Sequence, residues 1–511
     1  MTNNISSNIS DKSHKKLPFR GLGGFFFFLV ILLFFALAYP HHLHYQEQFQ
    51  LFLFDSAYIW DIVRLPGGVA DLLGRFCTQF FLFAWVGAAI IALMLTAVHL
   101  LTLRLASWGR FYPLTFIPAC LLWIFLLDEN ALLGGVWAVL LTLAASWLFD
   151  KLHGGWLRSL LFFAAVPVLY WIAGPVCVLF FLLQVLRPGF PKYCYAAFLL
   201  LVAMIVLLTH FIPVPADKLW YGIHYHRYPT EIPALLWAAV LSVFLLALVV
   251  RLFRRWAIAP THYAVTLCSL AVVAAGMGCL VWKNSNFKAE RTMHYDFMAC
   301  HQQWNRILDT VDAERPNNQI GVTVQNLALA MRGILLQRMF DYNQNGMLGL
   351  LPEVQRDATS PLPTAEAFYQ LGLVNVAQRT VFEAQEAILD YQKSARCYKR
   401  LAQTNLINGE YEVARKYLMA LQKTLFYRQW ANETLPLLYN EKAIAAHPEY
   451  GRMRKCSYNL DFFFGDQVTP DMLRSLYLNN KDNNIAYQYM LASFALTGDR
   501  ESFQSFVSAG K

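Results

Sequence analysis

The sequence lacks the short motifs that mark several classes of enzyme. Gly21, Gly23 and Gly24 precede an apolar run instead of following a strand, which argues against a phosphate-binding loop and a nucleotide site there. No Gly-x-Ser-x-Gly segment occurs, so the nucleophile elbow of the α/β-hydrolases is absent. The apolar runs also lack the internal duplication that transporters usually carry. None of these three classes is therefore favoured.

Cysteine is scarce and scattered. The nine cysteines form no metal-type pairs, and six of them lie within apolar runs, where they read as small core residues. Only Cys300, Cys397 and Cys456 lie in the less hydrophobic carboxyl half. Their odd number and wide spacing permit at most one disulfide and imply no disulfide scaffold.

Charge is also limited, because Asp, Glu, Lys and Arg together make up 15% of the chain. The formal net charge of +9 divides into +7 for residues 1–282 and +2 for residues 283–511. The basic excess lies at the ends of apolar runs, beside the expected lipid headgroups. It therefore sets membrane topology and argues against nucleic acid as a partner.

Long apolar runs are what the amino-terminal half has in abundance. A helix needs about 20 apolar residues to cross a bilayer, because the hydrocarbon offers no water to free peptide groups. The runs cover residues 21–39, 77–103, 113–127, 131–149, 157–172, 175–186, 193–212, 232–250 and 257–282. They predict a polytopic α-helical membrane domain over residues 21–282 with about nine passes. Residues 113–127 and 175–186 are short, which leaves the count open by one or two.

Basic residues alternate across these runs. Of the 17 Lys and Arg residues within residues 1–282, 13 fall in the breaks on one side, including the tail 1–20. The positive-inside rule places that side in the cytoplasm. Loops 40–76, 128–130 and 213–231 and the domain 283–511 then face outward, and we expect a bacterial inner-membrane protein with a periplasmic carboxyl-terminal domain. The first run also has features of a cleaved signal peptide, which would leave this orientation unchanged.

Residues 283–511 show helical periodicity rich in Tyr, Leu and Ala. Two stretches have a small residue between two apolar helices, at Gly409 and at Gly498. They resemble degenerate tetratricopeptide repeats, which stack into a solenoid and would bind a protein, peptide or polymer partner. The alternative is an irregular helical domain that caps the membrane half.

Carboxylates in the outward loops are the main candidates for chemistry. Glu47, Asp55 and Asp61 lie in the first loop, where the amphipathic segment 49–63 predicts an interfacial helix. Asp128 and Glu129 occupy a very short loop between two apolar runs. Adjacent carboxylates at that depth are costly unless they face a wet cavity, a cation or a metal. Simple solvation of an outer loop is the alternative for the first-loop acids.

Basic and aromatic residues of the third outward loop include Trp220, His224, His226 and Arg227. They predict a site for a lipid phosphate or a sugar ring, with an interfacial belt of aromatics and snorkelling cations as the competing interpretation. A second histidine group at residues 41–44 is interpreted as a solvated collar instead of a metal site, since its spacing matches no known ligand set.

This arrangement of a long acidic first loop and a short acidic second loop resembles the C-type integral-membrane glycosyltransferases. The resemblance implies sugar transfer from a polyprenyl-phosphate donor in envelope glycan assembly. Glu47, Asp55 or Asp61 would then act as the base, and Asp128 and Glu129 would hold a divalent cation such as Mg²⁺ or Mn²⁺. The sequence departs from that family because it has no Asp-x-Asp. Asp55 and Asp61 would also lie about 120° apart on an unbroken helix.

A second resemblance, at residues 65–71 and 78–81, is to an uncharacterised family of bacterial multi-pass membrane proteins, which implies no activity. The rival hypothesis is therefore a non-enzymatic membrane anchor that presents the helical-repeat domain for protein interaction in envelope assembly or secretion. The two hypotheses predict different positions for the acidic residues. An enzyme would gather Glu47 or Asp61 near Asp128 around one cavity, whereas an anchor would leave them scattered.

Overall fold

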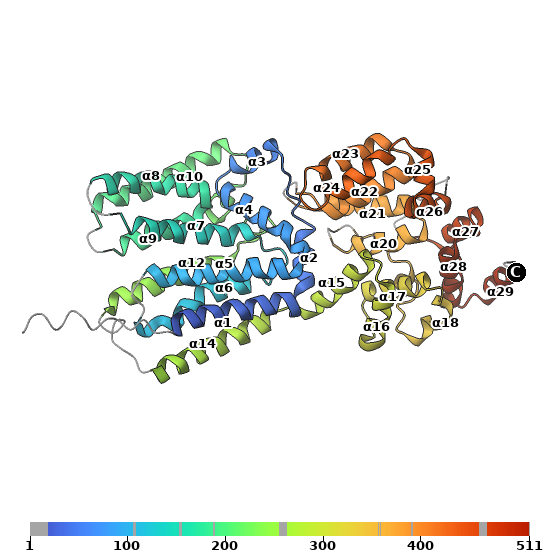
Figure 1. The fold of residues 1–511 in the computed structure, drawn as a ribbon, viewed down its shortest axis with the longest axis horizontal. Helices are drawn as coiled ribbons and strands as arrows, with labels where there is room; N and C mark the ends of the chain where they lie inside the picture. The colour runs from blue at the N-terminus through green and yellow to red at the C-terminus, as the bar shows by residue number, and fades with distance from the viewer. Residues whose placement is uncertain are drawn as a thin grey trace, which may run out of the picture.

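The computed structural model describes residues 19–105, 109–152, 156–187, 190–254, 263–355, 357, 359–389, 392–458 and 468–509. In these ranges the fold is all-helical, as predicted. The only β pairing there is an isolated antiparallel bridge between Ala131 and His226. Figure 1 shows an elongated molecule, with an apolar helical bundle at one end and a second helical domain, carrying the carboxyl terminus, at the other.

Six helical segments of the bundle are long and apolar enough to cross a membrane. They are Gly21–Ala38, Ala84–Leu105, Trp156–Val185, Tyr193–Phe211, Ala234–Leu252 and Ala264–Asn284, and two shorter apolar helices are Phe111–Phe125 and Leu133–Phe149. In helix labels these include α1 (Phe19–Leu33), α5 (Ala84–Leu105), α6 (Ile117–Phe125), α7 (Leu133–Phe149), α8 (Trp156–Ala173), α9 (Val178–Val185), α10 (Ala196–Phe211), α12 (Ala234–Leu252) and α14 (Tyr263–Asn284).

The 30-residue segment contains two of the predicted runs. Gly174 has φ 69° and separates α8 from α9. Arg158 in the first turn of α8 donates a hydrogen bond to Gln184 near the end of α9, at 3.3 Å. Because a residue near the start of one helix meets a residue near the end of the other, α8 and α9 form an antiparallel hairpin, not one straight helix.

Glycine permits a close contact between two helices of the bundle. A Cβ atom at Gly74 would lie 2.4 Å from the backbone nitrogen of Gly134. This contact joins α4 (Gly68–Thr78) to the start of α7. Small residues allow backbones to approach in this way where helices pack in an apolar environment.

The first loop differs from the prediction of one helix over residues 49–63. The chain forms α2 (Pro40–Glu47), runs without helix through residues 48–55, and then forms α3 (Ser56–Val63). The non-helical part enters the second domain. The backbone N–H of Leu51 donates to the carbonyl of Lys393 at 2.9 Å, and that of Phe54 donates to the carbonyl of Lys423 at 2.7 Å.

The second domain is built from short helices packed on their neighbours along the chain (Figure 1). The main ones are α15 (Phe287–Cys300), α16 (Trp304–Glu314), α17 (Gln319–Met331), α20 (Pro361–Leu371), α21 (Val374–Glu386), α22 (Ala395–Asn408), α23 (Tyr411–Gln422), α24 (Arg428–Thr434), α25 (Glu441–Ala446), α26 (Pro448–Cys456), α27 (Pro470–Asn479), α28 (Asn484–Thr497) and α29 (Arg500–Ala509). Both predicted helix–turn–helix pairs are present. Gly409 and Gly498 adopt left-handed φ values of 83° and 76° between their helices.

Two further contacts join the bundle to the second domain. Tyr39, just after the first apolar helix, accepts a hydrogen bond at its hydroxyl from the backbone N–H of Asn286, at 3.0 Å. Glu290 on α15 accepts the backbone N–H groups of His41 and His42 at 2.7 and 2.9 Å. These N–H groups belong to the first turn of α2, where helical peptides lack an internal partner. The carboxylate therefore caps α2 from the other domain.

Candidate functional site

The first-loop carboxylates of the sequence analysis lie apart from one another. Glu47 is 5% exposed and accepts the hydroxyl of Tyr427 at 3.1 and 3.2 Å. Burial raises the pKa of Glu47 to about 7, against the opposing effect of the Tyr427 hydrogen bond. This carboxylate therefore contributes to the contact between α2 and the second domain and does not open onto solvent.

Asp55 and Asp61 have different local partners. Asp55 caps α3 by accepting the N–H of Ala57 at 2.9 Å, and it forms an ion pair with Lys423 of the second domain. The Lys423 hydrogen bond is the main cause that holds the pKa of Asp55 below its usual value. Asp61 is exposed and pairs with Arg64 one turn away at 3.2 Å. Neither residue approaches the second acidic loop.

Asp128 and Glu129 diverge although they are adjacent. Asp128 accepts the N–H of Asn130 at 2.8 Å, and its other oxygen lies 3.1 Å from Nε2 of His226. Burial acts to raise the pKa of Asp128, but these hydrogen bonds outweigh it and hold the pKa below its usual value. Glu129 instead lines a cavity of about 360 Å³ between the bundle and the second domain.

The loop at residues 213–231 is folded against the loop at residues 128–130. The N–H of Leu132 donates to the carbonyl of Tyr225 at 3.1 Å, and the N–H of Arg227 donates to the carbonyl of Asn130 at 2.9 Å. This pairing places His226 beside Asp128. The sequence did place His226 and Asp128 among the site residues, but their direct contact could not be read from it.

Arg227 is the most deeply buried of the basic candidates, at 4% exposure. Its guanidinium carbon lies 4.3 Å from the ring centre of Phe49 and 5.7 Å from that of Tyr45, and its Nε has no hydrogen-bond partner among the described residues. Cation–π contacts of this kind stabilise a cation that has left water. Tyr45 separates Arg227 from the cavity that Glu129 lines.

The other two basic-loop candidates lie elsewhere. His224 has its Nε2 3.9 Å from Asp71, which in turn forms a buried pair with Arg75 at 2.9 Å. Trp220 is 40% exposed on α11 (Ala216–Tyr221). The structure therefore brings together Asp128, His226 and Arg227, with Glu129 next to them, and leaves the remaining candidates separate.

The junction cavity has a mixed lining and extends along the second domain. The 360 Å³ cavity is lined by Tyr45 and Glu129 from the bundle and by residues of α15, α17 and the start of α20. An adjoining cavity of about 350 Å³ shares Lys288, Thr292 and Ser360 with it. Hydroxyl, amide and charged groups of both signs face this space between apolar side chains, so the cavity offers hydrogen bonds and apolar contact to the same ligand.

Histidines from both domains meet beside this junction. The ring centres of His41 and His294 are 4.4 Å apart and stacked, and His44 stacks on Phe297 at 4.5 Å. Burial, followed by the nearby His294, lowers the pKa of His41 to about 3, and burial lowers that of His44 to about 4. Neutral imidazoles here are packing groups, and no cluster of three His, Cys, Asp or Glu side chains suited to a metal ion occurs among the described residues.

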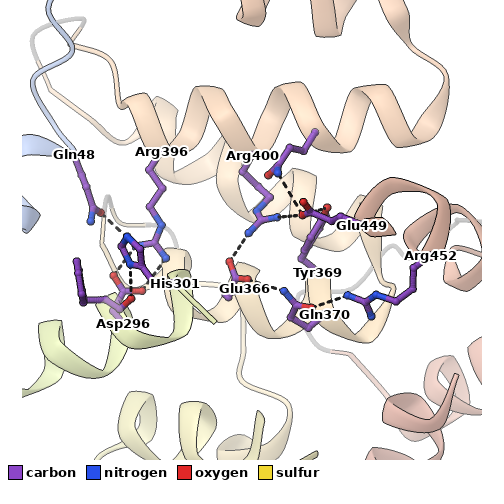
Figure 2. A network of polar contacts seen from close by, with 12 residues as sticks. Gln48, Asp296, His301, Glu366, Tyr369, Gln370, Arg396, Arg400, Glu449 and Arg452 are labelled. Atoms are coloured by element: carbon purple, nitrogen blue, oxygen red, sulfur yellow. Dashed lines mark hydrogen bonds and ion pairs between the residues drawn. The ribbon is translucent and has the colours of Figure 1, made fainter. Parts of the chain in front are cut away.

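A row of buried charges in the second domain was missed by sequence reasoning (Figure 2). Arg396 on α22 binds both carboxylate oxygens of Asp296 on α15, at 2.6 and 2.8 Å. One turn later, Arg400 pairs with Glu366 and stacks over the ring of Tyr369 at 3.7 Å. The spacing of Arg396 and Arg400 along α22 is the only local signal of this row.

Gln48 links the row of buried charges to the first loop. Its side-chain oxygen accepts a hydrogen bond from Arg396 at 3.3 Å, as Figure 2 shows. Asp296 lines the junction cavity as well. Gln48 and Asp296 therefore connect the row of buried charges to the inserted loop and to the cavity.

The comparisons with known proteins give a family and no activity. The model of a family described as "Family of unknown function (DUF6057)" matches residues 15–511. The chain therefore belongs to that family over almost its whole length. No curated protein matches the chain, and no solved structure does.

Proposed function

We propose that this protein is an integral-membrane scaffold that holds its helical carboxyl-terminal domain in a fixed position at the membrane surface. The observation that supports this proposal is the use of the first-loop groups. Glu47, Gln48 and Asp55 all bind residues of the second domain instead of surrounding a common cavity. That is the scattered arrangement expected of an anchor.

The proposal includes the topology expected from the charges. The bundle would cross the bacterial inner membrane about nine times with a cytoplasmic amino terminus, and the domain from residue 283 would be periplasmic. The antiparallel α8–α9 hairpin supports two passes within the long segment Trp156–Val185. Candidate outward loops 128–130 and 213–231 and the second domain all lie at the same end of the bundle, as one topology requires (Figure 1).

The partner of the scaffold would be a protein or polymer of envelope assembly or secretion. The helix pairs α22–α23 and α28–α29, each turning at a left-handed glycine, support degenerate tetratricopeptide-like repeats. Such repeats present extended binding surfaces. The 350 Å³ cavity between α15, α17 and α20 offers a surface with hydrogen-bonding groups for this purpose.

Sugar transfer from a polyprenyl-phosphate donor is the second candidate, and the position of Glu129 favours it. Glu129 is the one sequence-predicted acid that lines the junction cavity. A lipid phosphate or sugar would be bound by Arg227 and His226 after the Tyr45 ring that separates Arg227 from the cavity had moved aside, with His224 and Trp220 further away. Asp128 and Glu129 diverge and have no third carboxylate or histidine beside them among the described residues. They do not fit a divalent cation, and we derive no step through one.

A complementation experiment distinguishes the two candidates. A strain lacking the protein would receive the wild-type chain, the double variant Asp128→Asn/Glu129→Gln, or the junction variant Glu290→Leu, which removes the cap of α2, at matched protein levels. We expect the acid variant to restore envelope glycan profile and detergent resistance, and the junction variant to fail. Loss of glycan output in the acid variant with a functional junction variant would refute the scaffold and favour the transferase.

A further inference from the structure

An apolar groove runs along the side of the bundle between α1, α6 and α14. Its volume is about 390 Å³. Phe116, Cys120 and Trp123 form its floor, and side chains of α1 and α14, such as Phe27 and Met277, form its walls. Almost all of the lining is aliphatic or aromatic, so the groove offers no hydrogen bonds to a polar ligand.

The groove opens away from the protein. Only 6% of the residues in the most apolar stretch of α14 are buried inside the protein, and the side chains of Val272 and Trp282 on this helix are both 71% exposed. A helix with so little protein contact in an apolar bundle faces the hydrocarbon of the membrane. Lipid chains are therefore the molecules that surround the opening.

The dimensions fit one hydrocarbon chain. The α14 residues that line the groove, Leu270 to Trp282, span about 18 Å at 1.5 Å per residue. A volume of 390 Å³ over that length gives a mean cross-section of about 20 Å².

Groups suited to a phosphate lie at one end of the groove. Trp282 lines the groove and contacts Phe287 with ring centres 4.8 Å apart. Lys283 follows Trp282 directly, and Lys288 lines the junction cavity. Both lysines are exposed. An aromatic belt followed by cations is the pattern of a membrane–water interface that attracts anionic headgroups.

We propose that the groove between α1, α6 and α14 binds one acyl chain of an anionic membrane phospholipid, whose phosphate lies against Lys283 and Lys288. The inference depends on the membrane placement of the proposed function, but not on the scaffold role. The lipid would fill the gap beside α14 and hold this helix, which leads directly into α15 and the second domain, against the bundle.

The glycines of α14 supply a matched test. An added Cβ at Gly278 or at Gly276 meets no atom within 4 Å, so both positions accept a side chain without a clash. Gly278 lines the groove and Gly276 does not. The full-length protein would be reconstituted in vesicles of phosphatidylethanolamine and phosphatidylglycerol that contain phosphatidylglycerol with a photoactivatable acyl chain. Labelled residues would be located by mass spectrometry.

We expect labels on Cys120, Trp123 and Met277 in the wild type. Gly278→Leu should reduce them about tenfold, because about two methylene groups of lipid contact are displaced, while Gly276→Leu should leave them unchanged. Lys283→Gln/Lys288→Gln should remove the preference for phosphatidylglycerol over a zwitterionic probe. Even labelling along α14 that ignores Gly278→Leu would overturn the proposal, as would a dimer cross-linked through Gly278→Cys but not through Gly276→Cys. A reporter fused after Asn284 that is active in the cytosol would refute the proposed orientation without changing the labelling.

Discussion

The carboxylate that caps α2 from the second domain makes a testable pH-dependent contribution to stability. Burial raises the pKa of Glu290 to about 7 from 4.5, against the opposing hydrogen bonds from the N–H groups of His41 and His42. The folded protein then binds a proton at Glu290 between pH 4.5 and 7, whereas the unfolded chain does not. The stability from this group is complete below pH 4.5 and is lost as the pH rises through 7.

The size of the effect follows from the difference between the two pKa values. Between pH 8 and pH 5 the folded state gains about 2.5 kcal/mol relative to the unfolded state, at 1.36 kcal/mol per pH unit. Glu290→Gln cannot titrate and loses this gain. We therefore expect the melting temperature of the wild type, relative to that of Glu290→Gln, to be higher at pH 5 than at pH 8 by about 5–10 °C.

Thermal unfolding of the detergent-purified full-length protein, followed by intrinsic fluorescence at both pH values, measures this difference. Glu410→Gln is the matched control, because Glu410 is exposed at the turn between α22 and α23. Its difference from the wild type should not depend on pH. Equal pH dependence in the wild type and in Glu290→Gln would show that Glu290 is solvated, and the docking of α2 onto α15 would then be wrong.

Three further predictions concern the junction and the bundle. Burial lowers the pKa of His41 to about 3 from 6.5. At pH 5 this imidazole is protonated in the unfolded chain but not in the folded protein, so acidification to pH 5 lowers the stability of the folded protein by about 2 kcal/mol. His41→Gln should remove that loss in the same melting assay. Arg396→Leu should lower the free energy of unfolding by about 3–5 kcal/mol, because it leaves the carboxylate of Asp296 buried and unpaired. The control Arg415→Leu removes an ion pair on the surface and should change the free energy of unfolding, measured by chemical denaturation, by less than about 1 kcal/mol. Gly74→Ala should cost about 1–3 kcal/mol through overpacking against α7 and should lower the yield of monodisperse protein in size-exclusion chromatography.

Local features of the fold were predictable from the sequence. Apolar runs gave the helices of the bundle, because burial in lipid or protein demands contiguous apolar residues. The glycines at 409 and 498 gave the turns of two helix pairs, because a left-handed backbone favours glycine. Both signals operate within about 20 residues of chain. That the short run at residues 175–186 forms a separate helix antiparallel to α8 follows only from the contact between Arg158 and Gln184.

The candidate site was less predictable, because its geometry depends on distant residues. The segment 48–55 has apolar residues in succession, which resembles a helix facing a membrane. In the structure Phe49 and Leu51 are instead buried in two separate clusters of the second domain. Nothing local distinguishes these outcomes, since the partners of Leu51 and Phe54 lie more than 300 residues away.

The junction explains why a scaffold would keep so many buried polar groups. A flexible tether between two domains would need no charge at their contact, and an apolar contact would be more stable than an isolated buried ion. Paired ions are tolerated only in one relative geometry, because displacing either partner leaves the other charge desolvated. Glu290 with the first turn of α2, and Glu47 with Tyr427, cross the junction and therefore favour one orientation of the second domain, whereas the pair of Asp296 and Arg396 lies within the second domain. A rigid orientation is useful only if a partner must meet the domain at a fixed height and angle, and that requirement links the buried charges to the proposed function.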